Sequence, residues 1–164
     1  METKANSPRM SSLVDLYDLH TDYFKRALDG IAEKDTHNRL NTKANHIAWL
    51  SGSLVNQRFE MAKSLGIDHK SSTGELFENN KGIQDDAKYP SIEEYKKDWE
   101  VISPAFRNAL LEVTDKKLES SFEMPGMEMS YYQMMTFMIY REANIIGQIA
   151  LWRRLLGYAG INYM

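Results

Sequence analysis

Cysteine is absent from the 164-residue sequence, which excludes disulfides, thiolate zinc ligands and thiol nucleophiles. Histidine is scarce, and the available imidazoles are those of His20, His37, His46 and His69. The net charge of −3 provides no basic field of the kind that attracts phosphate backbones, so we expect no nucleic-acid partner. A chain of this size buries roughly 70% of its unfolded surface on folding, so stability alone requires neither disulfides nor a structural metal.

Long uncharged apolar runs are also missing from the sequence. The most apolar region, residues 131–158, is interrupted by four arginine and glutamate residues, so we expect no membrane-spanning segment. The N-terminal METKANSPRM has no apolar core of a signal peptide. We therefore expect residues 1–11 to form a flexible leader, residues 12–164 to form a single domain, and the protein to be cytoplasmic.

Four prolines and nine glycines are few for an all-β chain, which needs many turns, and the apolar residues instead recur at three- and four-residue steps. This periodicity predicts helices over residues 12–32, 41–65, 91–113 and 131–156. Residues 66–90 are polar and contain three glycines, so they predict a long crossover with at most one short helix near Leu76 and Phe77. The predicted fold class is all-α, a four-helix bundle with a long crossover between its second and third helices.

Local signals mark the ends of these helices. A serine followed three residues later by Asp, Glu or Gln predicts a capping box at the start of a helix, and a glycine after an apolar stripe predicts a helix end. The capping pairs are Ser12 with Asp15, Ser91 with Glu94, and Ser130 with Gln133; the terminating glycines are Gly66 and Gly157. The stripe of the second helix is predicted to contain Ile47, Leu50, Leu54, Met61 and Leu65, and that of the last Tyr131, Met135, Met138, Ile145, Ile149, Trp152 and Leu156. Pro104 is expected to bend the third helix, and Met124-Pro125-Gly126 to break the chain before the fourth.

Two segments resemble a known family. Residues 45–54, NHIAWLSGSL, are similar to the helix-two signature of the DinB/YfiT-like superfamily, in which Asn-x-Ile-Ala-Trp leads into Gly-His-Leu. Residues 140–149, YREANIIGQI, followed by RRLLG, resemble its fourth-helix signature, His-Glu-x-x-His-x-Gly-Gln-Ile with a basic, leucine-rich end. The resemblance covers nearly the whole chain and implies the DinB-like four-helix bundle. The family name refers to DNA-damage-inducible expression and implies no polymerase activity.

The resemblance implies a divalent metal, zinc or nickel, held by one histidine of the second helix and two of the fourth. Residues four apart lie on one helical face, so such a pair can present two imidazoles to one ion. Members of the family with this site are hydrolases or thiol-cofactor transferases, and homodimers are expected by the same analogy. This chain has Ser53, Arg141 and Ile145 at the three ligand positions, so we expect a degenerate site and no cofactor.

Arg141 is the most informative of these replacements, because its position faces the bundle interior and its own helix offers no carboxylate one turn away. An unpaired buried guanidinium costs several kcal/mol. Three interpretations stay open: a bridge to a carboxylate of another helix, a bound ligand's carboxylate or phosphate, or extension of the side chain to solvent. The candidate carboxylates are Asp15, Asp18, Asp22 and Glu60.

The histidines and the replaced ligands define the candidate cleft. His20 lies on the apolar face of the first helix and is expected to be a bonded core or cavity-lining histidine, with a catalytic base as the alternative. His46 lies seven residues before Ser53 and is expected to be a structural histidine rather than a metal ligand, whereas His37 and His69 fall in connections. We predict a metal-free module whose cleft, lined by Ser53, Arg141, His20 and His46, binds a small anion. The alternatives are a metal-dependent hydrolase or thiol-cofactor transferase, and a structural homodimer without ligand.

Overall fold

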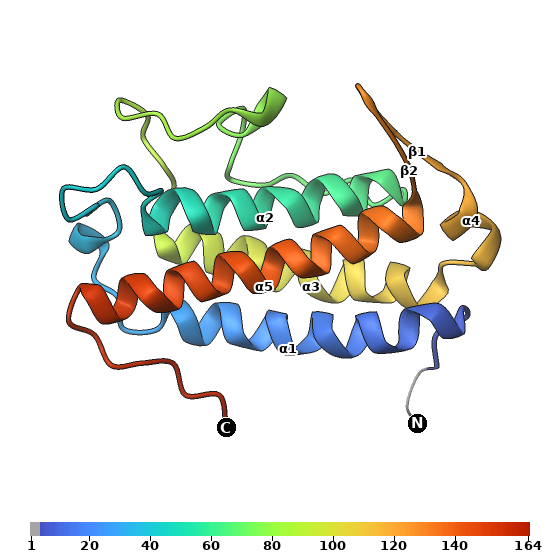
Figure 1. Ribbon diagram of the computed structural model, residues 1–164, viewed down its shortest axis with the longest axis horizontal. Coiled ribbons are helices and arrows are strands. Elements are labelled where there is room, and N and C mark those ends of the chain that lie inside the picture. Colours follow the sequence, from blue (N-terminus) through green and yellow to red (C-terminus); the bar gives the residue numbers. More distant parts are fainter. Residues whose placement is uncertain (1–3) are drawn as a thin grey trace.

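The computed structural model describes residues 4–164 and is mostly helical, in agreement with the predicted all-α class (Figure 1). The elements are α1 (Ser11–Leu28), α2 (Ile47–Ser64), α3 (Ile92–Glu112), α4 (Asp115–Glu119), β1 (Ser121–Met124), β2 (Met127–Ser130) and α5 (Tyr131–Leu155). The long helices α1, α2, α3 and α5 lie side by side, and α2 and α1 each pack against both α3 and α5. No helix within residues 4–164 combines the length and apolar character needed to cross a lipid bilayer.

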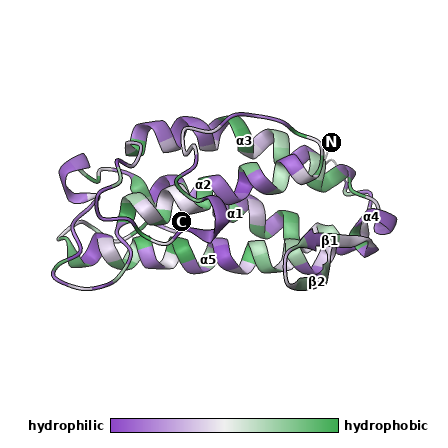
Figure 2. Ribbon diagram, turned by 90° about the horizontal axis from the view of Figure 1, so that it is seen from above, coloured by the Kyte–Doolittle hydropathy of each residue, from purple (hydrophilic) through white to green (hydrophobic). Residues whose placement is uncertain are grey.

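The core lies between these four helices and contains the predicted apolar stripes. Large side chains from different helices meet there, including Phe24 of α1, Leu54 of α2, Trp99 of α3 and Ile149 of α5. Phe24 and Trp99 are in direct contact, with ring centroids 4.3 Å apart. Hydrophilic residues dominate the connecting loops, whereas hydrophobic patches occur along the helices (Figure 2). The three- and four-residue periodicity therefore identified the inner faces of the helices.

Two of the predicted capping boxes are confirmed. The Ser91 side chain accepts a hydrogen bond from the Glu94 amide while the Glu94 carboxylate accepts one from the Ser91 amide, and Ser130 and Gln133 form the same arrangement. These boxes start α3 and α5 at the predicted positions. Gly66 adopts a left-handed conformation after α2, at the position predicted for a helix end.

The starts of the first two helices were predicted wrongly. Ser12 and Asp15 form no capping box, because α1 begins at Ser11 with Met10 as an N-cap that makes no side-chain hydrogen bond. The second helix begins at Ile47 rather than near residue 41, since Leu40 and Asn41 have positive φ angles and His46 supplies the cap. The first helix also ends earlier than predicted, at Leu28, because Asp29 is extended. Residues 29–46 are therefore a connection of several turns.

The segment between α3 and α5 contains structure that the sequence did not predict. The short helix α4 is followed by an antiparallel hairpin in which β1 pairs with β2, with Ser121 opposite Ser130 and Met124 opposite Met127. The predicted breaker forms its turn, where Gly126 has a φ of 79°. The hairpin extends from the end of the molecule where α5 begins (Figure 1).

Part of the predicted flexible leader is packed against the helices. Residues 1–3 lie outside the described residues, but Ser7 and Met10 are buried and the Asn6 amide donates a hydrogen bond to the Leu111 carbonyl of α3. The Ser7 hydroxyl bonds the Asp115 carboxylate. Part of the segment predicted as a leader therefore contacts the folded helices, through the buried residues Ala5, Ser7 and Met10.

Candidate functional site

A fully buried ion pair joins α2 to α5 at the centre of the molecule. The Arg58 guanidinium makes two parallel hydrogen bonds to the Glu142 carboxylate, Nε to Oε1 at 2.6 Å and Nη2 to Oε2 at 2.9 Å. Neither side chain has any exposed surface. This bidentate geometry is the strongest arrangement that an arginine and a carboxylate can form.

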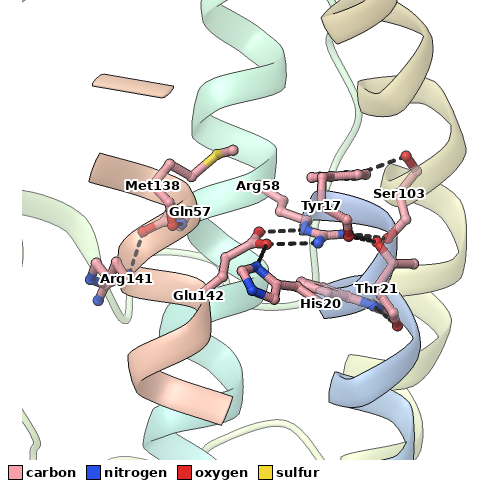
Figure 3. A network of polar contacts seen from close by, with 10 residues as sticks. Tyr17, His20, Thr21, Gln57, Arg58, Ser103, Met138, Arg141 and Glu142 are labelled. Carbon is pink, nitrogen blue, oxygen red and sulfur yellow. Dashed lines mark hydrogen bonds and ion pairs between the residues drawn. The ribbon is translucent and has the colours of Figure 1, made fainter. Parts of the chain in front are cut away.

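The remaining hydrogen-bonding capacity of Arg58 is directed at α1 and α3. Nη1 donates to the Thr21 hydroxyl and to the Ser103 hydroxyl, each at 2.8 Å. The guanidinium also stacks on the rings of Tyr17 and Trp99, with its central carbon 3.8 Å and 3.5 Å from the ring centroids. One side chain of α2 thereby contacts all three other long helices (Figure 3).

His20 completes this network from α1. Its Nδ1 lies 3.2 Å from Oε2 of Glu142, and its side chain is buried. Burial acts to raise the pKa of Glu142, but the Arg58 charge and the hydrogen bonds from His20 and Arg58 outweigh it, so the pKa lies below its ordinary value. Glu142 is therefore ionised at neutral pH. We call His20, Thr21, Arg58, Ser103 and Glu142 the Arg58 network.

The Arg58 network has the properties of a structural element rather than of a binding site. Both oxygens of Glu142 and all three nitrogens of Arg58 have partners within the protein. A ligand would have to displace these hydrogen bonds to reach either charge. His20 is a hydrogen-bonded core histidine, as the sequence predicted. Its partner, the Glu142 carboxylate, was not predicted.

Arg141 precedes Glu142 on α5 but points to a different part of the molecule. Its Nη1 donates a 2.7 Å hydrogen bond to Oε1 of Gln57, and its Nη2 donates a 2.6 Å hydrogen bond to the Ser53 hydroxyl. Gln57 is held in turn by a 3.4 Å hydrogen bond from Nε2 to the Met138 carbonyl. Ser53, Gln57 and Arg141 form what we call the Arg141 site. Gln57 and Arg141 lie beside the Arg58 network but separate from it (Figure 3).

The partners of Arg141 are neutral oxygens. No ion pair joins Arg141 to a carboxylate within residues 4–164, so of the three interpretations the bridge to an acidic side chain of another helix is wrong. Of the proposed carboxylates, Asp18 binds Arg107 and Asp22 binds Arg26. Burial lowers the pKa of Arg141, and the nearby Glu142 charge acts in the opposite direction. Arg141 is thus a half-buried cation that forms no ion pair with a carboxylate of the described chain.

The three positions that the resemblance assigns to metal ligands do not fit a metal ion. Ser53 and Arg141 lie together, but they present a hydroxyl group and a permanent cation. Ile145, one turn further along α5, is a buried alkyl side chain without a donor atom. Within the part of the chain that the structure describes, no three His, Asp or Glu side chains gather in a way that would hold a metal.

His46 lies away from the Arg141 site, at the N-terminus of α2. Its Nδ1 accepts a 3.1 Å hydrogen bond from the Trp49 amide, so the imidazole acts as the helix cap. The ring lies 4.6 Å from the His37 ring and 5.2 Å from the Tyr89 ring, between centroids. Burial, with the neighbouring His37, lowers the pKa of His46 to about 4, so it is neutral at pH 7. The structure therefore does not bring His20 or His46 to Arg141.

Sequence reasoning missed Arg58, Glu142 and Gln57, although the stripes contain a signal for the first two. The predicted stripe of the last helix passes from Met138 to Ile145 and leaves out the intervening heptad position, residue 142. The stripe of the second helix likewise passes from Leu54 to Met61 without the step at 58. Opposite charges that fill gaps in two apolar stripes indicate a buried pair between the two helices.

The comparisons with known proteins add no family to this geometry. No protein-family model matches the chain, and no curated protein matches it. The function is therefore inferred from the described residues themselves, among which Arg141 is the half-buried charge whose side-chain partners are neutral.

Proposed function

We propose that the protein is a metal-free binding module that holds a small anion, a carboxylate or a phosphate, at Arg141. The observation that carries this proposal is that the Arg141 guanidinium is half-buried and bonded only to the neutral oxygens of Ser53 and Gln57 within the described chain. Desolvating a cation without an opposite charge is costly. An anion from solution would supply that charge.

The geometry of the Arg141 site suits such a ligand. Ser53 and Gln57 fix the two terminal nitrogens of the guanidinium, so the group is already oriented before a ligand arrives. Nε makes no hydrogen bond to residues 4–164, which leaves a donor for an incoming oxygen. A planar guanidinium with free donors matches carboxylate and phosphate oxygens in direction as well as in charge.

The proposal includes a four-helix bundle of the DinB/YfiT-like type. Three features support this finer description: four long helices packed side by side, a connection of more than twenty residues between α2 and α3, and the contact between Ser53 and Arg141. The metal-dependent hydrolase and thiol-cofactor transferase alternatives require ligands that these positions do not supply. The proposed activity is therefore binding, with no metal at the family site.

A homodimer is the second part of the proposal. Large apolar side chains are exposed on α1 and α5, two helices that pack against each other. They are Leu16, Leu19, Phe137, Tyr140, Leu151 and Leu155. An exposed apolar surface of this kind is typical of an interface. Light scattering of the purified protein tests this part: a mass of twice 19.0 kDa supports the dimer, and a mass of 19.0 kDa at every concentration contradicts it.

Thermal denaturation with added anions tests the binding proposal. Acetate, benzoate, citrate and inorganic phosphate would be titrated against the wild type, Arg141→Met and Arg154→Met. We expect at least one anion to raise the melting temperature of the wild type saturably, because a ligand that binds only the folded state stabilises it. Arg141→Met should lose this response. Arg154 is exposed on the same helix, so Arg154→Met is the matched control and should keep it.

Two outcomes would contradict the proposal. One is that no anion of the series stabilises the wild type at concentrations where the control salt, chloride, has no effect. The other is that Arg141→Met responds as strongly as the wild type, which would place the bound anion elsewhere on the protein.

A further inference from the structure

A second group of cations surrounds a hollow at the end of the molecule where α1 and α5 finish. The hollow has a volume of about 500 Å³. Its walls come from the last turns of α1, the first turns of α3, the end of α5 and the C-terminal segment, which runs back beneath α1 (Figure 1). The lining residues are Lys25, Arg26, Asp29, Lys96, Arg153, Gly160, Ile161 and Asn162.

Arg153 is the most buried charge of this hollow, with 7% of its surface exposed. Its Nε donates to the Ala159 carbonyl at 3.0 Å, and its Nη1 donates to the carbonyls of Ala27 and Asp29. No carboxylate forms an ion pair with it in residues 4–164. The carbonyl oxygens at the end of α1 offset its charge only in part, because a helix terminus carries about half an elementary charge.

The third guanidinium nitrogen of Arg153, Nη2, has no hydrogen-bond partner in residues 4–164. It is also not one of the fully enclosed unpartnered atoms of residues 4–164, which are Trp49 Nε1, Ser51 Oγ and Tyr95 OH. Nη2 therefore keeps some solvent-exposed surface, on a side chain that lines the hollow.

Cations outnumber carboxylates among the residues that line the hollow. Arg26 is paired with Asp22 at 2.7 Å, and Lys96 with Glu93 at 3.0 Å, and both pairs are partly exposed to solvent, which weakens them. Lys25 has no ion pair within the described residues, and Asp29 is the single carboxylate in the lining. The lining thus presents four cations and one carboxylate to a ligand, while Asp22 and Glu93 beside it offset part of the charge of Arg26 and Lys96.

We propose that this hollow binds a small molecule that carries a phosphate or diphosphate group. Arg153, the most buried of these cations, supplies the oriented donor, and Lys25, Arg26 and Lys96 add positive charge to the lining. The volume exceeds that of a single phosphate ion and falls in the range of small-molecule sites, with Ile161 providing an apolar wall. The cations form one compact group on a chain of net charge −3, which favours a small ligand over a long polyanion.

Equilibrium titration with inorganic pyrophosphate, and with adenosine diphosphate, tests this proposal on the full-length chain. The test variant is the double substitution Lys25→Gln with Lys96→Gln. The matched control is Lys63→Gln with Lys116→Gln, which removes the same charge from two exposed lysines at the other end of the molecule. We expect one saturable site per chain at physiological ionic strength, weakened about tenfold or more in the test variant and by less than about twofold in the control.

Arg153→Gln alone is a poor test, because the substitution also removes the hydrogen bonds that hold the end of α1. The lining lysines avoid this difficulty, and a melting curve shows whether each variant is folded. Equal weakening in test and control variants would mean general charge attraction and would overturn the proposal, as would the absence of saturable binding. Loss of pyrophosphate binding in Arg141→Met, with the lysine variant unaffected, would assign the ligand to the Arg141 site instead.

Discussion

Arg141 and Glu142 are consecutive residues of opposite charge that do not pair with each other. Adjacent residues on a helix point about 100° apart, so Glu142 faces the core while Arg141 faces the edge of α2 (Figure 3). Both contact α2, but Glu142 binds the Arg58 guanidinium and Arg141 binds the neutral side chains of Ser53 and Gln57. Because the two side chains leave α5 in different directions, Glu142 forms an ion pair with Arg58, whereas Arg141 forms no ion pair with a carboxylate of residues 4–164.

Breaking the ion pair between Arg58 and Glu142 should destabilise the protein severely. Arg58→Met or Glu142→Gln leaves an unpaired polar or charged group in the core, and each should lower the free energy of unfolding by about 3–5 kcal/mol. The double variant Arg58→Met with Glu142→Met should lose much less than the sum, because both charges leave together. Urea denaturation measures these values.

The exposed pair of Arg107 and Asp18 provides the control for this prediction. Arg107 makes two hydrogen bonds to Asp18, at 2.7 and 2.8 Å, yet both side chains are well exposed to solvent. Asp18→Asn should therefore cost less than about 1 kcal/mol. If Arg58→Met costs no more than Asp18→Asn, the buried pair does not stabilise the fold in the way described.

Removing the charge of Arg141 should stabilise the protein instead. Arg141→Met keeps an unbranched side chain of similar length but removes a cation that burial has partly desolvated, so the ligand-free protein should gain about 1 kcal/mol of stability. Arg154→Met, at an exposed position, should change stability by less than about 0.5 kcal/mol. Melting curves in dilute buffer without multivalent anions decide this. A clear loss of stability in Arg141→Met would show that Ser53 and Gln57 already compensate the charge.

The sequence predicted the inner faces of the helices well because packing requires an apolar stripe with helical periodicity. Trp99, Ile149 and their neighbours are buried for that reason. It could not show which charges enter the core, because Arg58 and Glu142 look like surface charges unless both gaps in the stripes are matched. Residues 53 and 141, which the resemblance singled out, are in contact, but the sequence could not show that Gln57, rather than a carboxylate, completes the site.

Two kinds of local structure were beyond the sequence reasoning for different physical reasons. Histidine is not among the usual N-cap residues, so the start of α2 at His46 was not recognised. The hairpin of residues 121–130 is rich in methionine and glutamate rather than β-branched residues, so its strands had no clear propensity signal. Its turn was found, because Pro125 and Gly126 act locally and independently of the tertiary fold.

The cap at His46 should make stability depend on pH. The pKa of His46 is about 4 in the folded state against 6.5 for an ordinary histidine, so between these values the unfolded chain binds more protons. Stability from the neutral imidazole is then complete above pH 6.5 and is lost as the pH falls toward 4. His46→Asn retains a capping side chain without this titration. Its stability should fall less steeply than that of the wild type between pH 6.5 and 4, and equal slopes would contradict the role of His46.

Gly52 should be intolerant of even one added methyl group. A Cβ atom at this position would lie 2.3 Å from the Tyr95 hydroxyl and 2.7 Å from the Phe77 ring, so Gly52 permits α3 and the crossover to approach α2 closely. Gly52→Ala should destabilise the protein by about 1–3 kcal/mol through overpacking. Gly147 lies within α5 with open space around it, so Gly147→Ala should instead stabilise by about 0.5–1 kcal/mol. If both variants shift the denaturation midpoint equally, the close approach at Gly52 does not constrain the fold.

Introducing histidine at positions 53, 141 and 145 should create a zinc site. Ser53 and Arg141 are already in hydrogen-bonding contact, and residue 145 lies one turn beyond 141 on the same helical face, so three imidazoles could converge. A metal that binds only the folded state raises stability by about 2.7 kcal/mol at a hundredfold excess over its Kd, which a melting curve detects readily. A control triple variant with histidine at positions 53, 144 and 148 has the same number of imidazoles, but Asn144 and Gln148 are exposed and bonded to each other, so its zinc binding should be much weaker. A folded 53/141/145 variant that binds zinc no better than this control would contradict the DinB-like arrangement, and one tightly bound metal per wild-type chain by elemental analysis would contradict the metal-free proposal.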